Sequence, residues 1–218
     1  MKKIITLVLT LTCYFSLAAQ DVITEGVFTT KQTIKTDNEA VQAQLAMMGD
    51  MVSTTYFRDF MSRVELSNPM TGDVTVVFNS KTQEGLTLMN NPTLGKKFVL
   101  TSAKDPVPIM NNMKIEKGTN NRTILGYDCE EVILTYTENE NELKMIFYTT
   151  DKISPILNQR TMQYGNEIGG FPMYSEATIY QGDIKMTIIA EVTEIKDEAI
   201  NDSKLSLTPP EGYTEMNN

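Results

Sequence analysis

The residues with the clearest chemical potential are three carboxylates in one short stretch, Asp128, Glu130 and Glu131. Two carboxylates can act together as acid and base when they face each other across a substrate. The surrounding residues alternate as in a β-strand, so Glu130 and Glu131 are expected on opposite faces and cannot form such a pair. Asp183 and Asp197 lack the spacing of a calcium-binding loop. The carboxylates therefore predict neither hydrolysis nor a metal site.

The sequence contains no histidine and two cysteines. The absence of histidine removes Ser-His-Asp and Cys-His catalytic groups, histidine-ligated zinc and the usual general base near neutral pH. Cys13 lies in a segment expected to be cleaved, which leaves Cys129 without an internal disulfide partner. A small half-buried strand residue is the favoured interpretation of Cys129, and a reactive thiol is the alternative. A carboxylate-only mechanism survives these exclusions, but no motif in the sequence points to one. We therefore predict a protein without a cofactor that binds and does not catalyse.

The first twenty residues have the organisation of a cleaved export signal. Lys2 and Lys3 precede an apolar run from Ile4 to Leu17, and residues 16–20 (SLAAQ) form a small-residue exit. Residues 21–218 are then expected to form one domain in the periplasm, with extracellular release as the alternative location.

The whole chain has a formal net charge of −9, and loss of two lysines with the signal makes the domain more acidic. An acidic domain repels nucleic acid phosphates and anionic membrane surfaces. No other run approaches the roughly 20 apolar residues of a transmembrane helix. We therefore expect no nucleic acid partner and no integral membrane segment.

The central predicted element is a long β-hairpin over residues 122–150, with an acidic turn at residues 138–141. One register places three large apolar pairs on a single face, whereas a one-residue slip would mix the faces. These pairs are Tyr136 with Leu143, Leu134 with Met145, and Val132 with Phe147. The opposite face then carries Glu131 across from Tyr148, Thr135 across from Lys144, and the apolar pair Ile133 and Ile146.

Strands are predicted on both sides of this hairpin. Six shorter strands precede it, over residues 22–34, 52–57, 62–67, 74–79, 85–89 and 97–102. A second hairpin follows it, over residues 173–181 and 184–196, around the two-residue turn Gly182-Asp183. Its register sets Ile179 opposite Met186 and Ala177 opposite Ile188 on an apolar face.

One helix is predicted between the first two strands. Thr36 with Glu39 fits a capping box, Gly49 fits a helix end, and Val41, Leu45 and Met48 form an apolar stripe. Two prolines make residues 105–112 a loop. Residues 151–170 are expected to form a long excursion with a short helix near residues 156–164, and the tail from Pro209 onwards is expected to be loose.

These elements together predict a mainly β fold with minor α content. Nine or ten antiparallel strands form one strongly twisted sheet, and a sheet of this size tends to curl. We expect an unclosed β-barrel with one or two helices on its concave face.

Several segments, in sequence order, resemble the LolA/LolB-like group of exported proteins. They are MSRVELSNPMTGDVTVVFNS, ILGYDCEEVILTY, GGFPMYSEATIY and KMTIIAEVTEIKDEAINDSKLSLTPPEGY. The Ile-x-Gly-Tyr-x-Cys strand is similar to that of an uncharacterised periplasmic branch of the group, and the resemblance spans roughly residues 53–213. It implies a LolA-like half-barrel, lidded by helices, whose hydrophobic hollow carries acyl chains of lipoproteins. Arg63 resembles an arginine common in the group, although a surface ion pair with Glu65 is the favoured interpretation.

Two departures from this group concern lipoprotein transfer itself. The chain begins with a strand where the lipoprotein carrier begins with a helix, and it has no recognisable hook-like loop. The fold implied by the resemblance is unaffected.

Two functional hypotheses follow. The first is a periplasmic binding or carrier protein for a lipid, an acyl chain, a lipoprotein or another apolar ligand, and the 14 methionines suit such a surface. The predicted lining is Leu45, Met48, Val132, Leu134, Tyr136, Leu143, Met145, Phe147, Ile179, Met186 and Ile188. The alternative is a non-catalytic cell-envelope interaction or assembly module in which the same residues fill a core, and a sheet edge or the polar face binds a protein partner.

Overall fold

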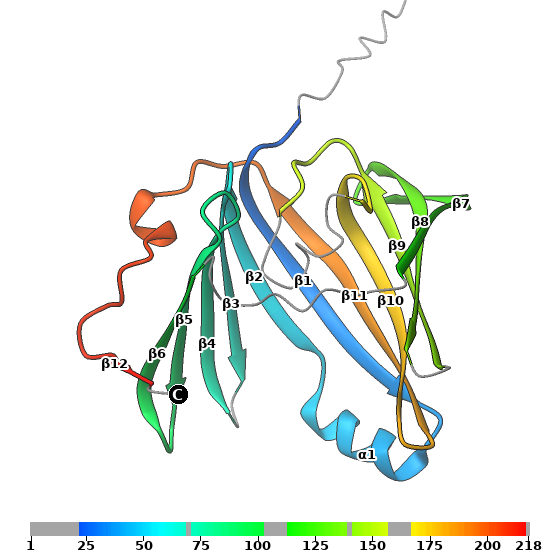
Figure 1. Cartoon of the computed structure of the whole chain (residues 1–218), viewed down its shortest axis with the longest axis horizontal. Coiled ribbons are helices and arrows are strands. Elements are labelled where there is room, and N and C mark those ends of the chain that lie inside the picture. Colours follow the sequence, from blue (N-terminus) through cyan, green and yellow to red (C-terminus); the bar gives the residue numbers. More distant parts are fainter. Residues whose placement is uncertain (1–21, 69–70, 103–112, 139–140, 157–166, 217–218) are drawn as a thin grey trace, which may run out of the picture.

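The computed structural model describes residues 22–68, 71–102, 113–138, 141–156 and 167–216. They form one 12-stranded sheet and a single α-helix (Figure 1). The elements are β1 (Glu25–Thr36), α1 (Glu39–Met48), β2 (Met51–Arg58), β3 (Met61–Asn68), β4 (Gly72–Asn79), β5 (Glu84–Asn91), β6 (Gly95–Thr101), β7 (Met113–Ile124), β8 (Tyr127–Glu138), β9 (Asn141–Thr150), β10 (Phe171–Gln181), β11 (Ile184–Lys196), the 3₁₀ helix η2 (Asp202–Leu205) and β12 (Thr214–Glu215).

The strand order is β12-β6-β5-β4-β3-β2-β1-β11-β10-β9-β8-β7. All neighbours pair antiparallel except β12, which pairs parallel with β6. Figure 1 shows β3–β6 and β7–β10 on opposite sides, with β2, β1 and β11 between them. The sheet is therefore curled and unclosed, which confirms the predicted mainly β architecture.

Both predicted hairpin registers are confirmed. Tyr136 pairs with Leu143, Leu134 with Met145 and Val132 with Phe147 across β8 and β9. Ile179 pairs with Met186 and Ala177 with Ile188 across β10 and β11. The segregation of apolar and polar side chains was sufficient to fix these pairings because only one register keeps one face apolar.

The helix begins at a different cap from the predicted one. The side chain of Asn38, not Thr36, accepts a hydrogen bond from the backbone N–H of Val41 (3.1 Å). The Thr36 hydroxyl instead donates to the carbonyl of Lys185 in β11 (2.7 Å). The predicted end at Gly49 is confirmed, since this residue has a positive φ of 70° and its N–H donates to the Leu45 carbonyl. Figure 1 shows α1 at the end of the sheet where β1 leads into β2.

Two elements differ from the sequence expectation. Strand β7 was not predicted because most of its side chains are polar and exposed, so no apolar alternation marks it. The tail from Pro209 onwards is not loose within its described residues, which reach Met216. Tyr213 and Leu207 pack against the buried Val77, Leu86 and Leu88, and β12 adds to β6.

Ion pairs also hold the C-terminal segment, residues 197–216. Arg63 Nε donates to Glu65 Oε1 (2.6 Å), which confirms the predicted pair, and Arg63 Nη1 donates to the carbonyl of Lys204 in η2 (3.2 Å). Arg58 contacts Asp202 (2.7 Å) and the carbonyl of Ile200 (3.0 Å). These contacts fix the segment on one face of β2–β6.

Four predictions fall on residues outside the described ranges. They are the cleaved signal at residues 1–20, the loop at 105–112, the tip of the turn at 138–141, and nearly all of the helix near 156–164.

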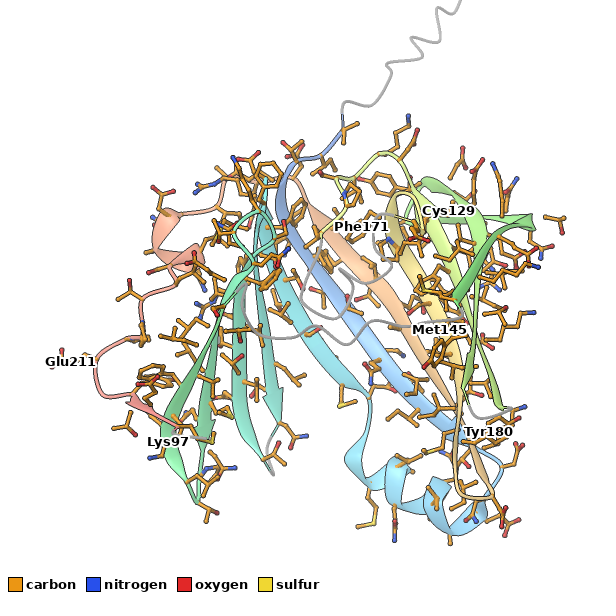
Figure 2. All side chains as sticks on the ribbon, in the orientation of Figure 1. Lys97, Cys129, Met145, Phe171, Tyr180 and Glu211 are labelled. Carbon is orange, nitrogen blue, oxygen red and sulfur yellow. The ribbon has the colours of Figure 1, made fainter. Side chains whose placement is uncertain are left out.

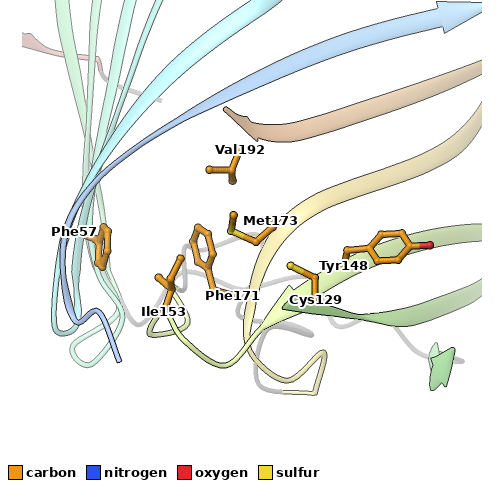
Figure 3. Close-up of a cluster of buried hydrophobic side chains, with 7 residues drawn as sticks. All are labelled: Phe57, Cys129, Tyr148, Ile153, Phe171, Met173 and Val192. Carbon is orange, nitrogen blue, oxygen red and sulfur yellow. The ribbon is translucent and has the colours of Figure 1, made fainter. Parts of the chain in front are cut away.

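A cluster of buried side chains links β2 with β8, β9, β10 and β11. We call it the central cluster, and Figure 3 shows its members: Phe57, Cys129, Tyr148, Ile153, Phe171, Met173 and Val192. Phe28 packs against it, with its ring edge-to-face on Phe171 at 4.9 Å between centroids. One apolar core thus holds together three strands that are far apart in the sequence, β2, β8 and β10.

Candidate functional site

The two faces of the sheet are covered differently. The C-terminal segment packs on the face of β2–β6 that carries Tyr56, Met61, Val77, Leu86, Leu88 and Phe98. Figure 1 shows this segment on the side of β3–β6 that points away from β7–β10. We call the opposite side of the sheet the inner face. Because strand side chains alternate, it carries the residues between those positions.

The predicted apolar residues lie on this inner face. Strand pairing places Leu134, Met145, Ala177, Ile188 and Ile34 in one row across β8, β9, β10, β11 and β1. A neighbouring row contains Val132 and Phe147. Figure 2 shows Met145 midway along β9 and Cys129 nearer the turn between β7 and β8. The sheet therefore brings together candidate residues from two hairpins.

Burial divides the predicted lining into two groups. Leu134 and Phe147 are 0% and 4% exposed and pack with Ile168, so they belong to a filled core. The others with described side chains are half-buried, namely Leu45, Val132, Tyr136, Leu143, Met145, Ile179, Met186 and Ile188. Three of them, Val132, Tyr136 and Met145, also pack against the edge of this core. Leu45 lines a small cavity beneath α1 with Ile34 and Met51. The Met48 side chain lies outside what the structure describes.

The inner face is also apolar in the other half of the sheet, which the sequence analysis did not include. The additional residues are half-buried and come from β3–β6: Val64, Leu66, Val74, Val76, Met89 and Val99. The alternation in Val64-Glu65-Leu66 and Val74-Thr75-Val76 carried this signal. The alternation in β4 was not recognised because Val77, next to Val76, is also apolar and packs on the outer face.

A polar network occupies the outer face of β7–β9. Glu131 is buried, and its carboxylate accepts hydrogen bonds from Asn120 Nδ2 (2.9 Å), the backbone N–H groups of Asn120 and Thr119, and the Tyr148 hydroxyl (3.1 Å). The β7 backbone departs from regular pairing between Lys117 and Asn121 to supply these donors. A Cβ at Gly118 would overlap the carboxylate. The pKa of Glu131 lies below its usual value, mainly because the Asn120 side chain donates hydrogen bonds to the ionised carboxylate.

Arg122 is held beside this network by two aromatic rings. Its guanidinium carbon lies 4.1 Å from the Tyr148 ring centroid and 4.8 Å from that of Tyr174, and the two rings meet edge-to-face. Burial is the main cause that raises the pKa of both phenols, and their hydrogen bonds to Glu131 and Glu176 raise it further. Both tyrosines therefore stay neutral donors at neutral pH.

A cavity of about 530 Å³ opens next to Arg122. Its lining is predominantly polar and comes from the β7–β8 turn region, the end of β9 and the start of β10: Asn121, Arg122, Thr123, Asp128, Cys129, Glu130, Thr149, Asp151, Gly169 and Gly170. Burial raises the pKa of the Cys129 thiol, the opposite of what activates a thiolate. Within the described residues, no group of three or more His, Cys, Asp or Glu side chains is placed to hold a metal ion.

Comparison with known proteins gives little further information. No family model matches the chain, and no curated protein matches it. The chain is similar to PNGF-II in its C2 crystal form, with 12% identity and a TM-score of 0.46, and in its P2₁ form, with 16% identity and a TM-score of 0.45. Each match covers 88% of this chain and 31% of that chain, so the chain spans about a third of PNGF-II. No helix in the described part of the chain is long and apolar enough to cross a membrane.

Proposed function

We propose that this protein is an exported, non-catalytic binding protein that holds an acyl chain or a similar apolar ligand on the inner face of its curled sheet. The proposed location is the periplasm, and a lipid or a lipoprotein is the proposed source of the chain. The LolA/LolB-like relationship inferred from sequence is part of this proposal. Its main support is the set of half-buried apolar side chains on the inner face of each half of the sheet, including Met145, Ile179 and Ile188 in one half and Val64, Val76 and Met89 in the other.

The residue types on this face suit a flexible apolar ligand. Branched side chains such as Val64 and Val76 give a smooth surface, and Met89, Met145 and Met186 adapt to irregular shapes. Each methylene removed from water contributes about 0.8 kcal/mol. About ten methylenes would contribute about 8 kcal/mol before the entropy of association is subtracted.

The edges of the sheet give less support to the alternative of strand addition by a partner protein. Strand β7 carries charged Lys114, Glu116 and Lys117 and an irregular segment at residues 118–120, and both features oppose edge pairing. At the other edge, β12 covers part of β6. These protected edges favour a ligand on the inner face over an added strand.

Met145→Glu is expected to weaken binding of a fluorescent fatty acid at least ten-fold, because a carboxylate on the inner face must lose hydration when an acyl chain covers it. Val76→Glu should have the same effect from the other half of the sheet. Lys144→Glu is the matched control, since Lys144 neighbours Met145 but lies on the opposite face and is exposed. Binding would be measured by fluorescence titration, with circular dichroism to check folding. Equal affinity of folded Met145→Glu and Lys144→Glu, or no uptake by the unmodified protein, would contradict the proposal.

A further inference from the structure

The middle of the inner face differs in chemistry from its two sides. The inner-face positions in the central part of β1 and β2 carry Thr30, Gln32, Ser53 and Thr55, which are polar but uncharged. Thr30 pairs directly with Ser53, whereas Gln32 and Thr55 lie two residues further along their strands, in opposite directions. We call these four residues the polar strip.

Apolar side chains border the polar strip on both flanks. Its partners on the neighbouring strands are Ala190 and Val192 on β11, and Val64 and Leu66 on β3. Figure 1 shows β1 and β2 between the two sides of the curled sheet. The polar strip therefore separates the apolar inner-face side chains of one half from those of the other half.

The charged residues of these central strands are sorted onto the opposite, outer face. Six charged side chains occur in β1, β2 and β3, and strand alternation places all of them at outer-face positions: Glu25, Lys31, Lys35, Arg58, Arg63 and Glu65. A phosphate or carboxylate pressed against the polar strip would lose hydration and gain no counter-ion from these strands. The strip therefore favours an uncharged polar group over an ionic one.

The polar strip has unused hydrogen-bonding capacity. Among the described residues, none forms a hydrogen bond with the side chain of Thr30, Gln32 or Ser53, and all three side chains are half-buried. A hydroxyl donates one hydrogen bond, and a glutamine amide donates two. A purely apolar ligand that covered these groups would remove their water and leave them unsatisfied. A ligand that spans both halves must therefore carry polar atoms in its middle.

The width of the polar strip indicates how many polar groups it can bind. Neighbouring strands lie about 4.8 Å apart, so the directly paired Thr30 and Ser53 are separated by about one strand spacing. Two acyl esters on adjacent glycerol carbons place two carbonyl acceptors at a comparable separation. A single ester in the middle of one chain offers only one carbonyl and would leave part of the strip unsatisfied.

We propose that the inner face binds a diacylglycerol-type lipid, with its uncharged diester on the polar strip and one acyl chain on each apolar half. This inference rests on the proposed function and narrows the ligand from any apolar chain to a lipid with two chains. The Thr30 and Ser53 hydroxyls and the Gln32 amide donate to the ester carbonyls.

Displacement of a bound fluorescent fatty acid by two short-chain lipids tests the proposal on the unmodified protein. The lipids are 1,2-dioctanoylglycerol and 1,2-dioctylglycerol, a diether with arms of the same length but no carbonyl oxygens. We expect the diester to bind about ten-fold more tightly than the diether, because only the diester offers carbonyl acceptors to the polar strip. This comparison needs no substitution, so it does not depend on the folding of a variant.

Substitutions then locate the effect. Thr30→Val combined with Gln32→Leu should weaken diester binding about ten-fold without weakening binding of the diether or the fatty acid. Thr54→Val is the matched control, since Thr54 is half-buried between Ser53 and Thr55 in β2 but faces the outer side. It should leave the affinity for all three lipids unchanged. Thermal melting would confirm that the variants are folded.

The outcomes separate this inference from the proposed function. Equal affinities of the unmodified protein for the diester and the diether would overturn the inference, as would diester binding by the folded double variant that matches the unmodified protein. In both cases, uptake of the fatty acid would leave the proposed function standing. Failure of the unmodified protein to bind any of the three lipids would overturn both.

Discussion

Phe171→Ala is expected to lower the free energy of unfolding by about 3–5 kcal/mol, the usual cost of removing a buried aromatic ring from a packed core. Phe171 is 2% exposed in the central cluster and contacts Phe28 edge-to-face. The truncation leaves a cavity in the cluster that Phe171 shares with Phe57 and Phe28. Urea unfolding followed by circular dichroism would measure the loss.

Phe60→Ala provides the matched control for this experiment. Phe60 has the same side chain but is 56% exposed in the turn between β2 and β3, so its truncation should cost less than about 1 kcal/mol. A similar small loss for both variants would show that the central cluster contributes little to the stability of the sheet.

Glu131→Ala is expected to cost about 1–3 kcal/mol. The substitution removes the common acceptor of Asn120, Thr119 and Tyr148. It leaves the hydroxyl of the buried Tyr148 without this partner, whereas the exposed Asn120 and Thr119 can bond to water. Glu130→Ala, one residue away, breaks only an exposed pair with Lys117 and should cost no more than about 1 kcal/mol. Equal losses for the two variants would contradict the assignment of Glu131 as the organiser of this segment.

The same carboxylate predicts a dependence of stability on pH. The pKa of Glu131 is lower in the folded protein than in the unfolded chain, so ionised Glu131 stabilises the fold above its unfolded pKa of about 4.3. This stabilisation is lost as the pH falls through the folded pKa. The free energy of unfolding should therefore fall less steeply below pH 4 in Glu131→Gln than in the unmodified protein.

Much of the fold could be predicted from local patterns. Six apolar residues on β8 and β9 specified one register, and Gly182-Asp183 specified the turn between β10 and β11. The polar strand β7 could not be recognised in this way because its position depends on pairing with β8 and on the hydrogen bonds around Glu131. The C-terminal segment was missed for a related reason, since single residues such as Leu205 and Tyr213 pack on a surface built from distant strands.

The candidate sites were predictable to different extents. The inner-face positions of Met145, Ile188 and Ile179 followed from strand alternation, whereas the burial of Leu134 and Phe147 under Ile168 required the tertiary structure. The pairing of Arg122 with two tyrosines also has no local sequence signal, because Tyr148 and Tyr174 come from β9 and β10.

Native mass spectrometry of the protein purified without detergent tests the proposed binding function most directly. We expect a stoichiometric adduct that is present under native conditions, disappears on denaturation and extracts into organic solvent as a lipid. The adduct should be absent from folded Met145→Glu and retained in Lys144→Glu. A clean protein mass, with no adduct after incubation with fatty acid or lipopeptide, would contradict the proposal and indicate that the inner face is a filled core.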